Sequence, residues 1–300
     1  MVTLRLKSPS GDLAFFSGIT SFDEGLDDSP FASNIIDICP VGALLSKDFL
    51  HKARAWDLDR TPSICPNCSQ GCNITLDVRD NLVQRLKPRH NPDVNSYWMC
   101  DYGRYRYEWM NRGAVTLGGQ GSGTRLEQPM MKAGGSLRPG GWQEVVKALV
   151  ERLRNAGSLT VIGSPWHANE DNGLLRRLQE VVGGGDALFR SPRAADEDVL
   201  PGFPKLVRRR DLAANTHGLE ALGFRRVGDD AGAGGIAVRD GAVVVLGDTL
   251  ADLPAGALDG ASLVAIGNHA MRASARVASG SAISGAGCCS PSGSWAPRSS

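Results

Sequence analysis

The sequence predicts an α/β fold in which a small cysteine-rich domain with a β-hairpin precedes a partial α/β domain with a parallel sheet. Four cysteines crowd a stretch where apolar alternation, turn residues and renewed alternation follow one another. Further along, short apolar runs alternate with amphipathic segments, which is typical of parallel strands joined by helices. The length of 300 residues agrees with about two domains.

The four cysteines are Cys65, Cys68, Cys72 and Cys100, with the spacing C-x2-C-x3-C-x27-C. Three thiolates bunched on one loop can hold three corners of a cube, and a segment that returns later supplies the fourth. This is how proteins grip a [4Fe–4S] cluster. Because a cluster with all four irons bound to protein offers no open site to a substrate, the motif predicts electron transfer.

A structural zinc site is the main alternative for the cysteines. Zinc sites usually consist of two well-separated CxxC pairs, because a tetrahedral ion needs two such knuckles. Here the third cysteine follows the second closely and the fourth stands alone, so the spacing favours the cluster.

A hairpin is predicted between the cysteine triplet and Cys100. Residues 74–79 and 82–86 alternate in polarity around Asp80-Asn81, a turn pair. This hairpin would carry the chain away from the triplet and return it, so that the last cysteine closes the cage.

The segment before the triplet is weakly patterned. Residues 2–6 alternate like a strand, and Leu44, Leu45, Phe49 and Ala53 share a helical spacing that predicts a helix. Cys39 is followed by proline, as is the last ligand of a ferredoxin-type run, but no partner run precedes it. The residues alone favour an ordinary buried cysteine at this position.

The third stretch carries the pattern of the α/β domain. A helix is expected from Trp142, and a second helix is expected at about 174–182. Its apolar strands are expected at 159–162, 243–246 and 263–266, and residues 191–235 are expected to form a long insertion. The inward positions of the first helix are expected to be Val145, Val146, Leu149, Val150 and Leu153.

Composition excludes several function classes. Apolar residues make up 42% of the chain, and 33 Lys and Arg balance 32 Asp and Glu, which gives no argument for nucleic acid or an anionic membrane. No apolar run approaches the roughly 20 residues of a membrane helix, and no signal peptide is recognisable. The expected compartment is the cytoplasm, where thiols stay reduced and clustered cysteines bind metal.

Other candidate features indicate structure rather than chemistry. The Gly-rich residues 118–123 do not form a phosphate-binding motif and are expected to be a linker. The histidines show no metal-ligand spacing. Aromatic residues crowd around Cys100, where they either shield a cluster from water or simply pack in the core; they are Tyr97, Trp98, Tyr102, Tyr105, Tyr107 and Trp109.

Three segments resemble a known family. Residues 37–49 (DICPVGALLSKDF), 61–74 (TPSICPNCSQGCNI) and 95–104 (NSYWMCDYGR) resemble the large iron–sulfur subunit (the G subunit) of bacterial NADH:quinone oxidoreductase, respiratory complex I. The cysteine quartet is also the signature of the [4Fe–4S] domain that opens the molybdopterin oxidoreductase superfamily. The resemblance is dense from about residue 32 to 111, looser to about 275, and absent afterwards.

The resemblance implies a domain organisation. Residues 1–57 would be the remnant of a ferredoxin-like iron–sulfur region, and residues 58–113 a [4Fe–4S] domain of the molybdenum/tungsten type. Residues 114–278 would form an incomplete α/β domain of molybdopterin-oxidoreductase type, and residues 279–300 a disordered, low-complexity tail. The chain is thus expected to be a truncated fragment of that large iron–sulfur protein.

The resemblance also assigns roles to cysteines. Cys65, Cys68, Cys72 and Cys100 would hold one [4Fe–4S] cluster, and Cys39 would be the last ligand of a second cluster whose other ligands lie upstream of this chain. Catalytic members of the superfamily carry a lysine between cluster and pterin where this sequence has Tyr102. This difference disfavours a bound molybdopterin.

The resulting hypothesis is an electron-transfer subunit of complex I, rather than a self-sufficient catalyst. Its partners would be other peripheral-arm subunits at the cytoplasmic face of the inner membrane, with no direct membrane insertion and no nucleic acid. Two alternatives remain: a fragment of a molybdopterin-dependent, formate dehydrogenase-like oxidoreductase, and a zinc-stapled structural or interaction domain.

Overall fold

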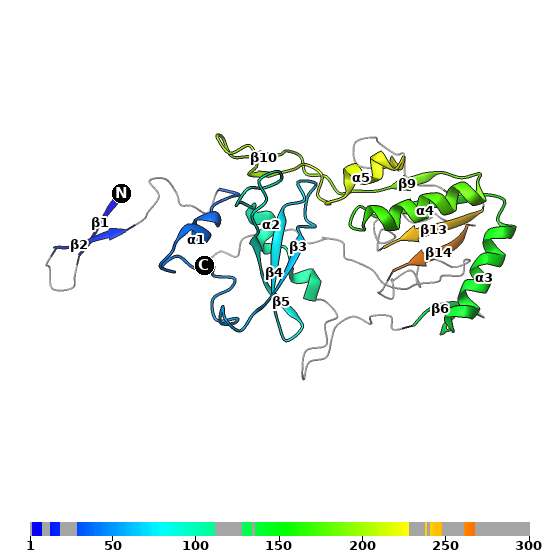
Figure 1. The fold of residues 1–300 in the computed structure, drawn as a ribbon, viewed down its shortest axis with the longest axis horizontal. Coiled ribbons are helices and arrows are strands. Elements are labelled where there is room, and N and C mark those ends of the chain that lie inside the picture. Colours follow the sequence, from blue (N-terminus) through cyan, green and yellow to red (C-terminus); the bar gives the residue numbers. More distant parts are fainter. Residues whose placement is uncertain are drawn as a thin grey trace.

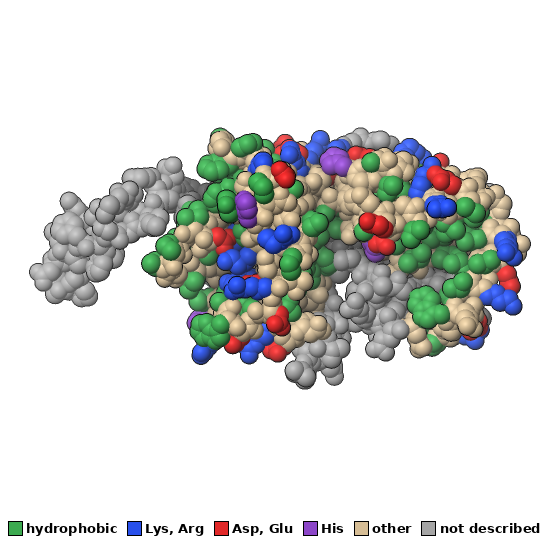
Figure 2. Space-filling view, viewed as in Figure 1, with side chains coloured by type: hydrophobic (Ala, Val, Ile, Leu, Met, Phe, Trp, Pro, Cys, Tyr) green, Lys and Arg blue, Asp and Glu red, His purple; other side chains and the backbone are tan. Residues whose placement is uncertain are grey.

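The computed structural model describes most of the chain between residues 2 and 267. The described ranges are 2–7, 13–18, 29–111, 128–133, 136–227, 238, 241–247 and 261–267. Within these ranges, no helix combines the length and apolarity that crossing a bilayer requires. Acidic and basic side chains are interspersed over the visible face of the molecule (Figure 2), in keeping with a net charge of +1.

A three-stranded antiparallel sheet forms the cysteine-rich unit, with the strand order β3-β4-β5 (Figure 1). A short helix precedes the sheet, and a second short helix and a 3-10 turn follow it. The elements of this unit are α1 (Asn34–Ile38), β3 (Asp59–Ile64), β4 (Asn73–Arg79), β5 (Leu82–Pro88), α2 (Asp101–Tyr105) and η2 (Glu108–Asn111).

The predicted hairpin is confirmed as the pair β4 and β5. Asp80 and Asn81 at its turn both have positive φ angles, 51° and 60°, as a type I′ turn requires. The sequence did not predict the third strand, β3, whose side chains are mostly exposed. Pro62 is tolerated there because β3 lies at the edge of its sheet, where a missing N–H breaks no ladder.

The helix expected around residues 44–53 is wrong. The chain instead forms the short α1 upstream, and residues 47–52 run through turns. His51 has a φ of 67°, which a right-handed helix does not allow, and Leu45 is 61% exposed rather than packed. The helical spacing there did not lead to a helix, and a helix this short is marginal unless tertiary packing stabilises it.

The strand expected near the N-terminus is confirmed, but its partner was missed. β1 (Val2–Lys7) pairs antiparallel with β2 (Leu13–Gly18), a strand that the sequence pattern did not indicate.

The second unit is built on a five-stranded parallel sheet with the order β12-β9-β8-β13-β14. Its strands are β8 (Leu159–Gly163), β9 (Ala187–Phe189), β12 (Arg225–Arg226), β13 (Ala242–Leu246) and β14 (Ser262–Ile266). Every residue of β8 and β13 is buried, as expected of central strands in a covered parallel sheet. The predicted α/β class and its three apolar strands are therefore confirmed.

Three helices belong to this unit: α3 (Trp142–Asn155), α4 (Asn169–Val182) and α5 (Thr216–Ala221). The first two confirm the predicted helices. The apolar stripe expected on α3 was too wide, because Val145 and Leu153 are buried while Val146 is 48% exposed and Val150 39% exposed. A hairpin of β6 (Met130–Ala133) and β7 (Ser136–Pro139) precedes α3 and was not predicted.

The insertion expected at 191–235 is narrower than predicted. Part of it leaves the sheet as the two-stranded β10 (Asp198–Val199) and β11 (Val207–Arg208), but α5 and β12 return to the sheet, where β12 pairs with β9. In Figure 1, the segment labelled β10 lies beside the cysteine-rich unit near α2, while α5 and β9 lie with the parallel sheet. We call residues 191–211 the excursion.

Residues 112–127, with the expected glycine-rich linker, and residues 268–300, with the expected low-complexity tail, lie outside the described ranges.

Candidate metal centre

Four buried cysteines from two parts of the chain form the candidate site. Cys65, Cys68 and Cys72 lie on the loop that leads from β3 into β4, and Cys100 is the residue immediately before α2. Their exposed fractions are 3%, 3%, 4% and 3%, in chain order. The structure therefore brings together the four residues that the sequence singled out.

The loop carrying the triplet is closed by its own backbone. The N–H of Cys65 donates to the carbonyl of Cys72 at 2.8 Å, so the first and third cysteines face each other across the loop base. Gly71 sits at a φ of 60°, a left-handed conformation that glycine adopts without strain. Its N–H donates to the carbonyl of Cys68 at 3.2 Å, which completes the tight turn between the second and third cysteines.

Cys100 is positioned by the start of α2. It is the N-cap of that helix, and its Sγ accepts a hydrogen bond from the N–H of Gly103 at 3.3 Å. This hydrogen bond by itself lowers the pKa of Cys100, although other causes outweigh it.

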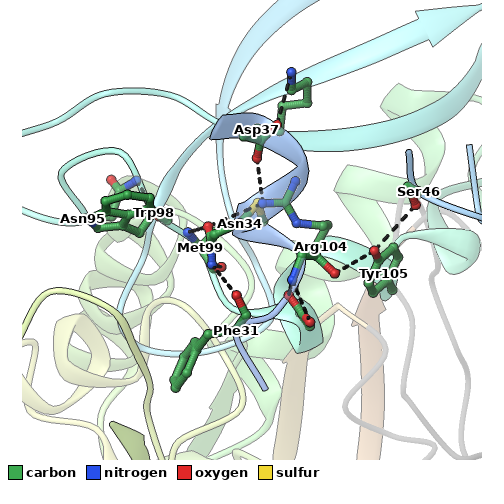
Figure 3. Close-up of polar contacts among 12 residues, drawn as sticks. Phe31, Asn34, Asp37, Ser46, Asn95, Trp98, Met99, Arg104 and Tyr105 are labelled. Carbon is green, nitrogen blue, oxygen red and sulfur yellow. Dashed lines mark hydrogen bonds and ion pairs between the residues drawn. The ribbon is translucent and has the colours of Figure 1, made fainter. Parts of the chain in front are cut away.

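Polar side chains hold the backbone just before Cys100, as Figure 3 shows. The amide of Asn34 in α1 donates to the carbonyl of Met99 at 2.8 Å and accepts from the N–H of Met99 at 3.1 Å. The amide of Asn95 donates to the carbonyl of Trp98 at 3.0 Å. Both asparagines are buried, and sequence patterns give no signal for the long-range pair of Asn34 and Met99.

Sulfur atoms from the two parts of the chain meet at Gly103. A Cβ placed on this glycine would lie 3.0 Å from Sγ of Cys65 and 3.5 Å from Sγ of Cys100. The Cys68 thiol in turn forms a hydrogen bond with the Cys100 thiol. Because residue 103 is glycine, with no Cβ, the sulfur atoms of Cys65 and Cys100 can lie close to its backbone.

Burial sets the acidity of these thiols. Burial raises the pKa of Cys65 to about 12, and it also raises the pKa of Cys72. The hydrogen bond between Cys68 and Cys100 lowers the pKa of Cys68 and raises that of Cys100. Four buried thiolates therefore require a compensating positive centre, which bound iron supplies. An all-cysteine donor set with this demand fits a [4Fe–4S] cluster.

Among the described residues, no three His, Cys, Asp or Glu side chains are grouped closely enough to hold a single metal ion. The preference for a cluster over zinc therefore rests on the spacing of the four cysteines in the sequence.

The excursion from the α/β unit covers one side of the site. The N–H of Ser69, next to Cys68, donates to the carbonyl of Asp211 at 2.8 Å, and Arg209 Nε donates to Oε1 of Gln70 at 2.9 Å. Leu206 belongs to the same buried group as Cys100. The sequence showed only missing periodicity here, so this contribution was not foreseen.

The aromatic residues near Cys100 divide into two sets. Tyr107 is buried in the apolar group that contains Cys65 and Cys72, while Trp98 and Tyr102 pack against the group that contains Cys100. Tyr97 is 62% exposed and stacks on His90 with ring centroids 4.1 Å apart. Tyr107, Trp98 and Tyr102 therefore can shield the cysteines from water, whereas Tyr97 packs on the protein surface.

A salt bridge joins the two short helices beside the site. Arg104 of α2 is 6% exposed and donates through Nη2 to Oδ2 of Asp37 in α1 at 2.7 Å. Lys87 of β5 contacts the other oxygen of Asp37 at 3.1 Å. Figure 3 shows Arg104 reaching toward Asp37 and Asn34, so α1 is held against the helix that Cys100 begins.

Cys39 is not part of this arrangement. It is partly exposed at the C-terminal end of α1 and lies outside the buried groups that contain Cys65, Cys72 and Cys100. Hydrogen bonding from the backbone N–H of Leu44 is the main cause that lowers its pKa. Cys288 and Cys289 lie outside the described residues.

Side chains of Ser164 and His167 lie close to Gly247 at one edge of the parallel sheet. In the sheet order, the chain changes direction between β8 and β13, and ligands of open α/β sheets bind at such a point. A Cβ on Gly247, after β13, would lie 3.0 Å from Oγ of Ser164 and 3.1 Å from Nε2 of His167. The chain's own side chains thus crowd this edge of the sheet.

Comparison with known proteins agrees with this site. Residues 58–112 match the molybdopterin oxidoreductase Fe4S4 domain, a family whose description names a four-iron, four-sulfur cluster. The match covers all four cysteines and indicates this cofactor for the chain.

Curated relatives share more of the chain. It is 39% identical over 185 residues to NADH-quinone oxidoreductase subunit 3 of Thermus thermophilus, which covers 61% of this chain and 22% of the relative. It is 36% identical over 137 residues to the NADH-quinone oxidoreductase G subunit of Rickettsia bellii, covering 46% and 18%, and 32% identical over 157 residues to the G subunit of Escherichia coli, covering 52% and 16%.

The chain thus spans about a fifth of the length of these relatives. Both comparisons agree with the resemblance that the three sequence segments indicated. The chain is therefore similar in part to NADH-quinone oxidoreductase G subunits, and its residues 58–112 match the molybdopterin oxidoreductase Fe4S4 domain.

Proposed function

We propose that this chain carries electrons through one [4Fe–4S] cluster held by Cys65, Cys68, Cys72 and Cys100. The observation that carries the proposal is the convergence of these four buried cysteines around Gly103 and the start of α2. When bound, the cluster supplies reversible one-electron chemistry.

The protein residues have three tasks at this site. The thiolates hold the irons, and the N–H of Gly103 donates to Cys100 Sγ at 3.3 Å. The backbone N–H groups of Gln70 and Arg209 donate to the Cys68 sulfur. The buried side chains of Tyr107 and Leu206 exclude water. Hydrogen bonds to sulfur and exclusion of water are two of the means by which a protein sets a cluster's potential.

The relatives suggest the assembly in which the chain would act. They are named as subunits of NADH-quinone oxidoreductase, so we assign this chain to the electron path from NADH to quinone in respiratory complex I. It would act as an electron-transfer subunit rather than a self-sufficient catalyst. Its partners would be other subunits of the peripheral arm, at the cytoplasmic face of the inner membrane.

The domain boundaries and Cys39 belong to the same proposal. Residues 58–113 would be the cluster domain, and residues 114–278 an α/β scaffold that docks neighbouring subunits. Residues 1–57 would be the end of a ferredoxin-like region, in which Cys39 completes a second cluster together with ligands not in this chain.

Anaerobic reconstitution tests the proposal. The chain is loaded with iron and sulfide, the iron is counted, and the reduced protein is measured by EPR. We expect about four irons per chain and the signal of a reduced cubane cluster. Cys68→Ser should lose this signal, whereas Cys39→Ser should keep it. A purified protein with bound zinc and no iron, or an unaltered Cys68→Ser signal, contradicts the proposal.

A further inference from the structure

Besides backbone N–H groups, the excursion places a positively charged side chain, Arg208, beside the cysteines. Arg208 lies in β11, directly opposite Asp198 in the paired strand β10. Its side chain is only 13% exposed, which is unusual for an arginine outside a functional or buried ion pair.

The position of Arg208 is fixed by several contacts. Its Nε donates to Oδ2 of Asp198 at 2.5 Å, and its Nη2 donates to the carbonyl of Asp196 at 3.2 Å. Its guanidinium carbon lies 5.8 Å from the ring centroid of Tyr102, the aromatic residue that packs against the Cys100 group. The guanidinium is therefore held between its own strand pair and the cysteine site.

The backbone on both sides of Arg208 is tied to the cysteine-rich unit. The next residue, Arg209, donates its backbone N–H to the Cys68 sulfur. Further on, the carbonyl of Asp211 accepts from Ser69 at 2.8 Å. On the other side, Leu206 is buried against Cys100 and Phe31. These contacts fix the register of β11 against the site, so that Arg208 has little freedom to move away.

We propose that Arg208 sets the reduction potential of the cluster, raising it by the charge that it holds beside Cys68 and Cys100, with Asp198 moderating the effect. The proposal rests on the proposed function, because it requires the cluster to be bound. It assigns to the excursion a second task beyond covering the site.

The physical basis is the charge that reduction adds. One electron, taken from an external reductant such as dithionite, makes the cluster more negative, and a nearby fixed cation stabilises that state relative to the oxidised one. The Arg208 charge is attracted to the sulfurs of both Cys68 and Cys100. Because the Arg208 side chain is largely shielded from solvent, salt and water screen this attraction less than they would at the surface.

Asp198 allows the direction of the potential shift to be tested. It is 31% exposed and pairs with Arg208, so it cancels part of the arginine's charge as felt at the cluster. Removing Arg208 should therefore lower the potential, and removing the charge of Asp198 should raise it. A role limited to packing would move both variants in the same direction, if it moved them at all.

The experiment is a redox titration of the reconstituted full chain, followed by EPR, with iron counted in every sample. For Arg208→Gln, we expect the ratio of reduced to oxidised cluster at the wild-type midpoint to fall roughly tenfold, a shift of about 59 mV for one electron. Asp198→Asn should shift the midpoint upward. Arg208→Lys should keep most of the wild-type value, because it retains the charge.

Arg225 in β12 offers a matched control. Arg225→Gln removes the same charge from a side chain that is 66% exposed and paired with Asp186, outside the cysteine-rich unit, so this variant should shift the midpoint much less than Arg208→Gln.

Two results overturn the inference: a fully loaded Arg208→Gln protein with an unchanged midpoint, or shifts of equal sign in Arg208→Gln and Asp198→Asn. If Arg208→Gln binds no iron, the direction of the Asp198→Asn shift decides. A wild-type chain that takes up no iron fails at an earlier step and contradicts the proposed function itself.

Discussion

The amide of Asn34 pairs with both main-chain groups of Met99, donating to its carbonyl at 2.8 Å and accepting from its N–H at 3.1 Å. The two residues are far apart in sequence, and Met99 directly precedes Cys100. The Asn34 side chain thus pairs with both backbone groups of Met99, as a neighbouring β-strand would. This pairing fixes the position of the backbone just before the fourth cysteine.

Replacing Asn34 by alanine should make the backbone before Cys100 less firmly held. Asn34→Ala leaves the N–H and carbonyl of Met99 buried without their partner, which costs roughly 1–3 kcal/mol for each unsatisfied group. We expect a lower unfolding temperature and faster loss of iron to a chelator. Asn155→Ala, at the exposed end of α3, should change neither value. Equal iron release from both variants contradicts this role of Asn34.

Gly103 is predicted to tolerate no side chain once the cluster is bound. In Gly103→Ala, the new Cβ would lie 3.0 Å from Cys65 Sγ, an atom that a bound cluster holds in place. Crowding of this kind typically costs about 1–3 kcal/mol. The reconstituted variant should therefore retain less iron than the wild type after gel filtration.

Gly173 in α4 provides the opposite case for comparison. A Cβ there meets only Leu222 at 3.9 Å, which is ordinary contact. Gly173→Ala should raise the free energy of unfolding by roughly 0.5–1 kcal/mol, because alanine loses less backbone entropy in a helix. Normal iron content in Gly103→Ala is the result that speaks against the crowding argument.

Asp211 should make stability depend on pH in the acid range. Burial by itself would raise the pKa of its carboxyl, but hydrogen bonds from Arg226 at 2.6 Å and Arg193 at 2.9 Å outweigh it, and the pKa is lowered. A lowered pKa in the folded state means that the ionised group stabilises the fold above its ordinary value of 3.8. That stability is lost as the pH falls through the folded-state pKa.

We therefore expect Asp211→Asn to be less stable than the wild type at pH 7, by roughly 1.5–3 kcal/mol for the charged hydrogen bonds. The difference should shrink below about pH 4. Urea unfolding across this range measures it. Asp186→Asn serves as the control, since its pair with Arg225 is 66% exposed on both sides. A difference that stays constant with pH would mean that the Asp211 charge is not responsible.

Cluster removal should expose the excursion to proteolysis. Its hydrogen bonds reach Ser69, Gln70 and the Cys68 sulfur, so their geometry depends on the loaded cysteine loop. Trypsin should cut after Arg208 and Arg209 faster in apo protein than in loaded protein, and mass spectrometry of early fragments measures this. Cleavage after Arg154, at the end of α3, should be the same in both forms.

Most of the candidate site could be predicted from the sequence. A cysteine motif has fixed spacing because ligands of one cluster must share a loop, so Cys65, Cys68 and Cys72 identify the candidate site without any structure. The hairpin that returns the chain to Cys100 was equally visible, since Asp80-Asn81 is a strong turn signal between alternating strands. Asn34 and Arg208 carry no such signal, because each acts on a residue far away in sequence.

The fold was predicted where burial imposes a period. The central strands at 159–163 and 242–246 are apolar throughout because both faces of the sheet are covered. The helix expected at 44–53 was wrong for the converse reason: its spacing matched a helix, but Leu45 is 61% exposed, so burial does not impose that period on the segment. Short elements such as β9 and β12 were missed because two or three residues are too few to show a period.

The sequence by itself thus determined the four-cysteine motif, its hairpin and the class of the second unit, because each follows from local spacing or from the period of buried residues. Only the tertiary structure decided that residues 191–211 leave the parallel sheet and cover the four cysteines. The link between them runs largely through backbone groups, such as the N–H of Ser69 and the carbonyl of Asp211. Every residue except proline offers both groups, so their pairing leaves no mark in the amino-acid sequence.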